Sequence, residues 1–359
     1  MGTGFGERLA RLVAVAVVLA GVGFGAAVCV AQQETPAVAG HFPLGALGGA
    51  TAWLNSKPLT AKELKGKVVL VDFWDYSCIN CIRSIPYVKA WAEKYKDAGL
   101  VVIGVHTPEF DVEKQQANVQ RAMGKFGITY PVALDNEMNV WTGFHNQYWP
   151  AHYFLDATGK VRYWHFGEGE YEKSEQWIQQ LLAERKAKPM ATGAVSVQGQ
   201  GVHAASDRRL VRSPETYIGY GRADRFASEA VIVPDVAHVY REPNLLGLNA
   251  WGLAGEWAGH MQYAELKKPG GKIVFRFHAR DLHLVLGPGA GVQPERFRVT
   301  LDGKAPGENH GVDTDSEGNG VVTEHRLYQL VRLGGPIEDH TFAIEFEDAG
   351  VEAFSFTFG

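Results

Sequence analysis

The sequence predicts a three-layer α/β sandwich followed by an all-β, jelly-roll-like sandwich, both behind an export signal. From residue 51 to 188, apolar runs alternate with segments of helical periodicity, which favours alternating strands and helices. From 207 to 359, short alternating strands lie between Gly, Pro and Asp turns, with no long helical pattern. At 359 residues the chain is long enough for two domains, since roughly 100–200 residues per domain is usual.

The first 31 residues have the layout of a secretory signal, because Arg8 and Arg11 precede an apolar run and a polar stretch follows. The run from 12 to 31 reaches 20 residues, the length that spans a bilayer. Cleavage, a retained anchor at 12–31 and a lipid on Cys29 all stay open. Each alternative places the rest of the chain in the periplasm or on the outer face of the cytoplasmic membrane.

The composition is that of a globular protein, with 46% hydrophobic and 21% charged residues. A net charge of −5 gives no basic footprint, so nucleic acid is excluded as a partner. If the signal is removed, Cys78 and Cys81 are the only cysteines left, and no disulfide framework can form.

The α/β part is predicted in the order β-α-β-α-β-β-α. An apolar run over 67–74 predicts a strand covered on both faces. A helix after the cysteine pair has an inward face at spacings of three and four, formed by Ile82, Ile85, Val88, Ala92 and Tyr95. Further segments are strands at 99–107 and 130–135, helices at 111–127 and 171–188, and a hairpin turning at 157–160.

The flanking segments have no periodicity. Residues 32–50 are rich in Ala, Gly and Pro and are interpreted as a tether, and residues 189–206 as a linker. The second domain then follows as predicted strands at 216–222, 272–279, 281–287, 296–303, 326–333, 340–348 and 351–359.

The pair Cys78-Ile-Asn-Cys81 allows three interpretations. A zinc site needs four ligands, usually as two close pairs, and no second pair exists. A disulfide closing so short a ring adds little stability. A redox pair fits better, because the pair follows a buried strand and opens a helix. There the helix N-terminus is expected to lower the pKa of Cys78 from about 8.5 into the range of roughly 3.5–7.5. Cys81 would then resolve the mixed disulfide.

The stretch VVLVDFWDYSCINCIRSIP resembles the thioredoxin superfamily, in its TlpA- and redoxin-like branch: a strand ending in Asp-Phe-Trp, a CxxC pair, and Pro86 five residues later. The resemblance implies that Asp72, six residues before Cys78, accepts and returns the proton of the resolving thiol. A hydrogen-bonded aspartate in a strand is the alternative.

The same resemblance implies a cis-proline facing the cysteines. The stretch YWPAHYFLD fits, so a cis Trp149–Pro150 bond is predicted, with Pro150 positioning the substrate and Trp149 shaping its cleft. A core tryptophan is the alternative for Trp149. Trp74 and Ser77, which flank the pair, are further candidates for substrate binding.

The motifs DYSCINC, VIGVHTPEF, YWPAHYFLDATG, HFGEGEY and SPETYIGYGR resemble the extracytoplasmic part of the DipZ family, from about Trp53 to Gly359. Such proteins carry a multi-span electron-transfer module of the CcdA type, whereas this chain has only a signal or single anchor. The resemblance therefore implies a separate membrane electron donor of that type.

The β-sandwich has two candidate ligands. The resemblance to carbohydrate-binding modules implies glycan, which aromatic residues could stack against unless they belong to the core: Tyr217, Tyr220, Trp251, Trp257 and Tyr263. The stretch DTDSEGNGVVTE nearly matches a calcium loop, with Asp313, Asp315, Glu317 and Glu324 as ligands. A hairpin turn is the alternative for it, because no helices flank the stretch.

These observations favour an exported thiol-disulfide oxidoreductase that reduces protein disulfides through a mixed-disulfide intermediate. Its catalytic residues would be Cys78, Cys81 and Asp72, with no cofactor beyond the redox-active Cys78–Cys81 pair. The rival is a cell-envelope protein that binds glycan or a partner and has a regulatory or vestigial redox domain. The dipeptide Ile79-Asn80 leaves the direction of electron flow open.

Overall fold

The computed structural model describes residues 43–185, 193–229, 231–289 and 294–359. These residues all belong to one compact unit, 36–359. The predicted signal, the candidate anchor at 12–31, Cys29 and part of the predicted linker lie outside the described residues. Within the described ranges, none of the helices combines the length and the apolar character needed to cross a membrane.

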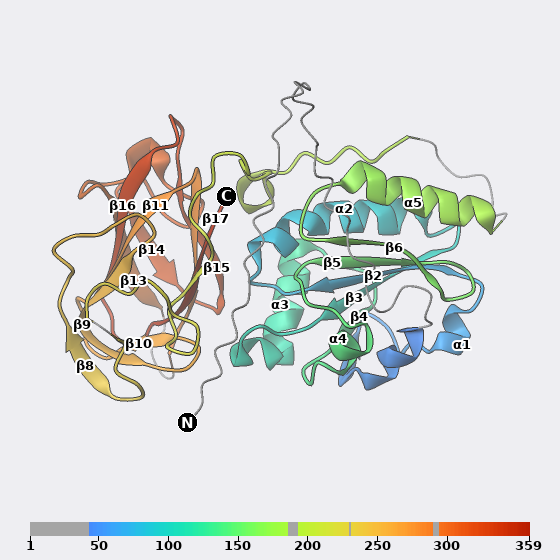
Figure 1. The fold of residues 1–359 in the computed structure, drawn as a ribbon, viewed down its shortest axis with the longest axis horizontal. Helices are drawn as coiled ribbons and strands as arrows, with labels where there is room; N and C mark the ends of the chain where they lie inside the picture. Colours follow the sequence, from blue (N-terminus) through green and yellow to red (C-terminus); the bar gives the residue numbers. More distant parts are fainter. Residues whose placement is uncertain (1–42, 186–192, 230, 290–293) are drawn as a thin grey trace, which may run out of the picture. The chain divides into compact units, whose positions relative to one another are not determined.

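A six-stranded mixed sheet forms the middle layer of the first domain, in the order β1-β4-β3-β2-β5-β6 (Figure 1). Strands β2, β3 and β4 are parallel, and β1, β5 and β6 run antiparallel to their neighbours. The apolar run predicted at 67–74 is β2, and every one of its residues is buried. The strands are β1 (Ala52–Leu54), β2 (Val68–Trp74), β3 (Leu100–His106), β4 (Val132–Leu134), β5 (Ala151–Leu155) and β6 (Val161–Phe166).

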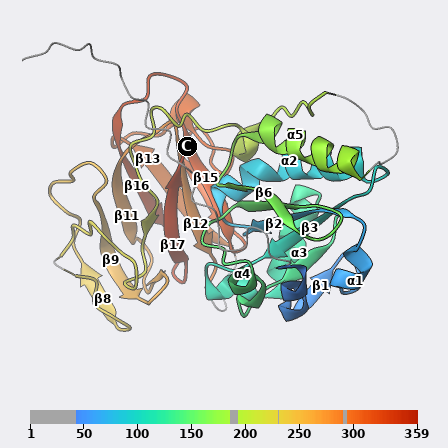
Figure 2. The same ribbon diagram turned by 45° about the vertical axis from the view of Figure 1, so that its right-hand side comes forward.

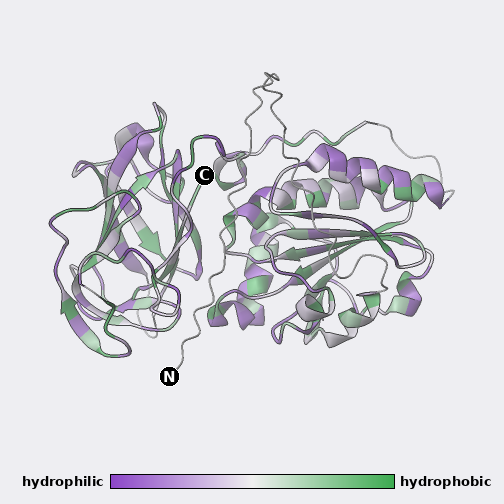
Figure 3. Cartoon of the chain, viewed as in Figure 1, coloured by the Kyte–Doolittle hydropathy of each residue, from purple (hydrophilic) through white to green (hydrophobic). Residues whose placement is uncertain are grey.

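Helices cover both faces of this sheet, as Figures 1 and 2 show. Helices α2 (Ile79–Tyr95), α3 (Gln116–Phe126) and α5 (Tyr171–Glu184) pack their apolar residues into one core cluster. The 3₁₀ helix η1 (Pro43–Gly49), α1 (Ala61–Leu64) and α4 (Asn139–Gly143) build a second cluster on the other face. In Figure 3 the solvent side of α5 is largely hydrophilic. The predicted three-layer α/β sandwich is confirmed.

Three local expectations of the first domain are corrected. The predicted tether 32–50 is a 3₁₀ helix over 43–49, because Leu44 and Leu47 are buried against the core. The helix predicted at 111–127 is two elements, η2 (Asp111–Lys114) and α3. Helix α4 was not expected from the sequence.

The second domain is all-β, as predicted. Its described strands join into an 11-stranded set with the main order β14-β13-β16-β11-β9-β10-β17-β12-β15, while β7 pairs with β17 and β8 with β9. All these pairings are antiparallel, and the strands enclose one apolar core. The strands are β7 (Thr216–Tyr217), β8 (Ala237–Tyr240), β9 (Trp251–Gly259), β10 (Ala264–Leu266), β11 (Lys272–His278), β12 (Asp281–Gly287), β13 (Glu295–Leu301), β14 (Asn319–Val322), β15 (Arg326–Arg332), β16 (Asp339–Phe346) and β17 (Glu352–Phe358).

The described part of the predicted linker is attached to the first domain. The backbone N–H of Val195 donates to Glu175 Oε2 at 2.7 Å. Residues 201–203 form the short helix η3, and His203 Nδ1 lies 2.8 Å from the carbonyl oxygen of Ile82. This segment therefore runs beside α2, the helix that begins at the cysteine pair.

Candidate active site

The two cysteines lie where the sequence predicted them, at the start of α2. Cys78 is the N-cap residue, with φ −73° and ψ 113°, and its Sγ accepts a hydrogen bond of 3.2 Å from the backbone N–H of Cys81. Both cysteines are free thiols; Cys81 is buried and Cys78 partly exposed. The pair is thus in its dithiol form, with one sulfur open to a pocket and the other behind it.

The predicted low pKa of Cys78 is wrong for this state. Burial by the surrounding atoms raises the pKa of Cys78; the hydrogen bonds with Cys81 oppose this shift, and the negative charges of Asp75 and Glu215 add to it. Burial likewise raises the pKa of Cys81 well above its usual range. Cys78 is at the helix N-terminus, and burial is the largest cause of the upward shift of its pKa.

Asp72 lies in the middle of β2 and is 1% exposed. Its Oδ1 is 3.2 Å from Nε2 of His152, which is directly opposite on β5 and fully buried. Burial raises the pKa of Tyr130 well above its usual range, and the charges of Asp72 and Cys81 add to the shift. Cys81 and Tyr130 belong to the same buried core cluster. His152 was not identified from the sequence as a neighbour of Asp72.

The predicted cis Trp149–Pro150 bond is present. Pro150 comes directly before β5, and its carbonyl oxygen accepts a bond of 2.8 Å from the N–H of Gly167. Trp149 is half-buried; its Nε1 donates to the carbonyl oxygen of Thr107 at 3.0 Å, and its ring packs on Trp141 with centroids 4.1 Å apart. Trp149 also lines the pocket beside Cys78.

Two candidate substrate-binding residues do not reach the pocket. Trp74 is fully buried in the first core cluster, since it belongs to a strand covered on both faces. Ser77 is 2% exposed, and its Oγ donates to Glu113 Oε1 at 2.5 Å. Burial raises the pKa of Glu113 well above its usual range, and the nearby Asp75 adds to the shift. The side chains of Trp74 and Ser77 therefore pack inside the protein beneath the segment that precedes Cys78.

The pocket in front of Cys78 has a volume of about 400 Å³ and walls from both domains. Glu109 connects the two walls of the pocket. Its Oε1 accepts hydrogen bonds from Tyr217 Oη at 2.8 Å and Arg222 Nη1 at 2.7 Å. The first domain contributes Cys78, Ile79, Asn80, Glu109, Gln147, Tyr148 and Trp149, and the second Ser213, Glu215, Tyr217, Arg222, Thr357 and Phe358. Sequence reasoning missed the wall from the second domain.

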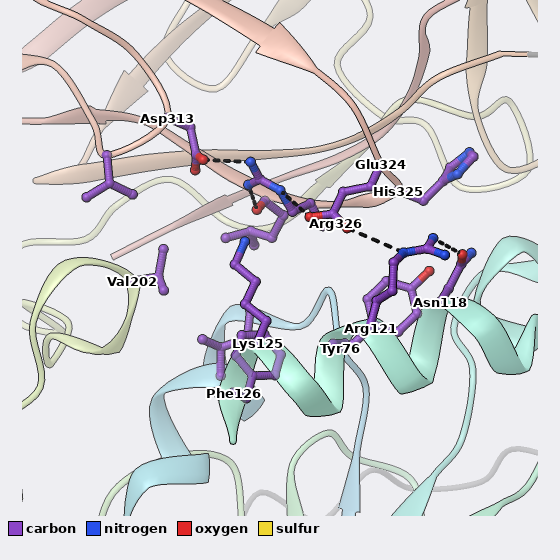
Figure 4. A pocket seen from close by; sticks show the side chains of 14 residues that line it. Tyr76, Asn118, Arg121, Lys125, Phe126, Val202, Asp313, Glu324, His325 and Arg326 are labelled. Carbon is purple, nitrogen blue, oxygen red and sulfur yellow. Dashed lines mark hydrogen bonds and ion pairs between the residues drawn. The ribbon is translucent and has the colours of Figure 1, made fainter. Parts of the chain in front are cut away.

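The predicted calcium residues are engaged elsewhere. Asp313 accepts from Arg326 at 2.7 Å, and Glu324 pairs with Arg326 at 3.1 Å and with Arg121 at 3.5 Å (Figure 4). Asp315 accepts from the backbone N–H of Asn319 at 2.8 Å, and Glu317 is exposed. In the described parts of the chain, no three His, Cys, Asp or Glu side chains gather at a possible metal site. The hairpin interpretation fits this segment.

Figure 4 also shows the second cavity that both domains line. It has a volume of about 230 Å³, lies between α3 and the segment around Arg326, and has Tyr76 and Ile82 from the cysteine segment in its wall. Most of the charged residues that line this cavity form ion pairs with one another. We therefore interpret the cavity as part of the interface between the two domains.

Comparison with known proteins agrees with the geometry. A model of the redoxin family matches residues 33–179, and a model described as a thioredoxin-like C-terminal domain matches 213–359. The thiol-disulfide oxidoreductase YkuV of Bacillus subtilis is 32% identical over 143 residues, which cover 40% of this chain and 95% of YkuV. The chain belongs to the redoxin family of the thioredoxin superfamily.

One further similarity extends over most of this redoxin-family chain. Protein DipZ of Mycobacterium tuberculosis is 39% identical over 318 residues, 87% of this chain and 42% of DipZ. The chain thus spans less than half the length of DipZ, and the predicted resemblance to it is confirmed for both domains. Among solved structures, a thioredoxin-like protein in the oxidised form is 30% identical, with a TM-score of 0.35 and coverage of 42% of this chain and 94% of that one.

Proposed function

We propose that this protein is an extracytoplasmic thiol-disulfide oxidoreductase that reduces protein disulfides with the Cys78–Cys81 dithiol. The observation that carries the proposal is the asymmetry of the pair: Cys78 opens into the pocket from the helix N-terminus, while Cys81 is buried behind it. An exposed attacking thiol with a shielded second thiol is the arrangement that forms and then resolves a mixed disulfide.

The reaction transfers two electrons in two exchanges. Cys78 loses its proton, and the thiolate attacks one sulfur of the substrate disulfide; the other sulfur leaves and takes up a proton. Cys81 then loses its proton and attacks Cys78 Sγ, which releases the second substrate sulfur as a thiol. The substrate is reduced and the Cys78–Cys81 disulfide forms. A separate membrane donor of the CcdA type would return the two electrons.

Asp72 is the proposed base for the second exchange. Cys81 needs one, because burial raises its pKa well above neutrality. His152 Nε2 lies 3.2 Å from the Asp72 carboxylate in a site that is closed to solvent. We assign His152 the role of a positioning residue that orients Asp72.

Pro150 and Trp149 are proposed to hold the substrate beside Cys78. A cis-proline donates no backbone hydrogen bond, which leaves the preceding peptide unit open to an extended segment. Trp149 is itself held by its bond to Thr107 and by Trp141, so the wall it forms is rigid.

Glycan binding by the second domain is the other candidate function. A polar pocket of about 650 Å³ favours it, because Tyr220 and Tyr263 line this pocket beside Asp235 and His260. Two of the predicted sugar-stacking residues, Trp251 and Trp257, are fully buried in the core and cannot take part. Titration with soluble cell-envelope glycan fragments, compared between the wild type and Tyr220→Ala, tests this function.

Turnover of a disulfide substrate with dithiothreitol tests the redox function. The wild type should accelerate reduction, and Cys78→Ser should lower the rate to that of dithiothreitol alone. The matched control is Gln120→Ala, on the exposed side of α3, which should keep the wild-type rate. Equal rates for Cys78→Ser and the wild type would exclude the enzyme.

A further inference from the structure

The second domain contributes an acidic group to the pocket into which Cys78 opens. Glu215 precedes β7 and lines this pocket together with Cys78 and Trp149. Its segment, Ser213 to Tyr217, is the opening of the motif by which the second domain resembles the DipZ family. From the sequence, only Tyr217 of this segment was a candidate, for stacking on glycan, whereas the structure brings the segment in front of the reactive thiol.

This wall is fixed firmly to the first domain. Tyr217 and Arg222 both donate to Glu109, and the Arg222 guanidinium lies 3.7 Å from the centre of the Tyr217 ring. The rings of Phe110 and Phe354 pack with centroids 5.1 Å apart. Ile79, beside Cys78, belongs to the same buried cluster. Opening the wall would expose this cluster, so substrates must fit the pocket as it stands.

The dimensions of the pocket limit what can reach Cys78. A volume of about 400 Å³ is near the lower end of small-ligand sites, which range over roughly 300–1,000 Å³. Because Cys78 lies in a pocket, a substrate disulfide has to project from its own surface to reach the sulfur. A short flexible segment can enter, and Asn80 and Gln147 present amides that can bind its backbone.

The charge of the pocket is negative. Arg222 neutralises Glu109 at 2.7 Å, and behind the wall Asp75 is buried and adds another carboxylate. Glu215 is exposed to the pocket, and among the described residues no cationic side chain forms an ion pair with it within 4.0 Å. Glu215 is therefore the carboxylate of this pocket that has no ion pair of its own and is available to a cation from the substrate.

We propose that this pocket selects disulfides carried on short, flexible, positively charged peptide segments, with Glu215 as the residue that binds the cationic side chain. The inference rests on the proposed redox function and names the substrate class of the same site. The small volume of the pocket favours a flexible segment. The carboxylate of Glu215, which has no ion pair of its own, favours Lys or Arg next to the substrate cysteine.

The preference should depend on pH. Crowding by the pocket walls raises the pKa of Glu215 to about 7, and Glu109 and Asp75 raise it further, while Tyr217 and Arg222 oppose the shift. As the pH rises through about 7, Glu215 becomes charged and the attraction to a cation grows. The Cys78 thiolate increases over the same range, but it accelerates reaction with every substrate equally, so it cancels in a ratio of rates.

The experiment compares two short linear peptides in single turnover. Each carries one cysteine in a mixed disulfide with 5-thio-2-nitrobenzoate, whose release is followed by absorbance, and they differ only in Arg or Gln beside that cysteine. The reduced wild type should favour the Arg peptide by roughly three- to tenfold at pH 8, and less at pH 6 or in high salt. In Glu215→Gln the ratio should fall towards one, while Glu317→Gln, an exposed control, should keep it.

A wild-type ratio near one at both pH values, or a ratio that Glu215→Gln leaves intact, overturns the role of the charge. Equal rates for a disulfide in a compact folded protein and in a linear peptide of the same sequence overturn the role of size. Failure of the redox function looks different, because then neither peptide reacts faster with the wild type than with Cys78→Ser.

Discussion

Two acidic groups lie on opposite sides of the cysteine pair, and they differ in burial and in origin. In the first domain, the buried Asp72 lies 3.2 Å from the buried His152, whose ring also packs near Trp91 and His165. In front of Cys78, Glu215 is open to the pocket and comes from the second domain. Under the two proposals above, the first domain supplies the base that takes the proton of Cys81, and the second domain supplies the carboxylate that selects the substrate.

The largest effect is expected for Asp72→Asn. An amide cannot take the proton of Cys81, so closure of the Cys78–Cys81 disulfide should slow by roughly 10²–10⁴-fold, the range of general base catalysis. The first attack by Cys78 should change little. Rapid-quench alkylation of the mixed-disulfide stage separates the two steps. Asp97→Asn, on the surface, is the control; equal slowing of both steps would mean that Asp72 acts on the fold instead.

The next largest effect is expected on stability, from a substitution at the interface between the two domains. Arg83, two residues after Cys81, is 3% exposed, and its guanidinium lies 3.3 Å from Glu168 and 3.9 Å from Asp281 of the second domain. Arg83→Met removes a buried cation, while Arg280 and Arg332 stay near Asp281 and Arg208 stays near Glu168. The free energy of unfolding should therefore fall by less than the loss of about 3–5 kcal/mol expected for a buried charge left unpaired, but by more than for an exposed pair. Urea unfolding measures this. Arg296→Met removes an exposed pair as the control, and an equally small loss in both variants would contradict a fixed interface.

His152→Gln should have a smaller effect than Asp72→Asn on the same step. Loss of the polar contact with Asp72 at 3.2 Å should raise the barrier to closure by about 1.4 kcal/mol, which corresponds to a roughly tenfold lower rate. The first attack by Cys78 should keep its wild-type rate, because His152 does not line the pocket. Equal slowing of both steps would reduce His152 to a structural role.

The smallest effect is expected at Asp75. Its negative charge adds to the effect of burial in raising the pKa of Cys78. Removing that charge in Asp75→Asn stabilises the thiolate, lowers the pKa and increases the thiolate fraction at any pH below that pKa. Alkylation of Cys78 by iodoacetamide at pH 8 should accelerate about three- to tenfold. A slower reaction would mean that the hydrogen bonds from Ser77 and Glu109 to Asp75 matter more than its charge.

Local patterns predicted much of the fold. The apolar run of β2 and the spacing along α2 are properties of neighbouring residues, and both elements formed as expected. Strand β9 was missed because Gly252, Gly255 and Gly259 interrupt its alternation. The helix over 43–49 was missed because its Ala- and Gly-rich composition concealed two buried leucines.

The site was predictable only where its residues are close in sequence or part of the motif. Cys78, Cys81, Asp72 and the cis bond at Pro150 were found in this way. The contact of Asp72 with His152 depends on strand pairing across 80 positions, and the approach of Glu215 to Cys78 on the packing of two domains. The expected pKa shift of Cys78 has the wrong sign, because burial raises the pKa and the extent of burial leaves no local pattern in the sequence.

The central claim is that Cys78 attacks the substrate disulfide and Cys81 resolves the mixed disulfide. The most direct measurement is to trap that mixed disulfide and identify the cysteine that carries it. The purified Cys81→Ser variant is mixed with a peptide disulfide, quenched with acid and digested, and the adduct is located by mass spectrometry. The account predicts a stable mixed disulfide on Cys78 that does not form in Cys78→Ser. No adduct on Cys78, or an adduct on Cys81 in the Cys78→Ser variant at an equal rate, would contradict it.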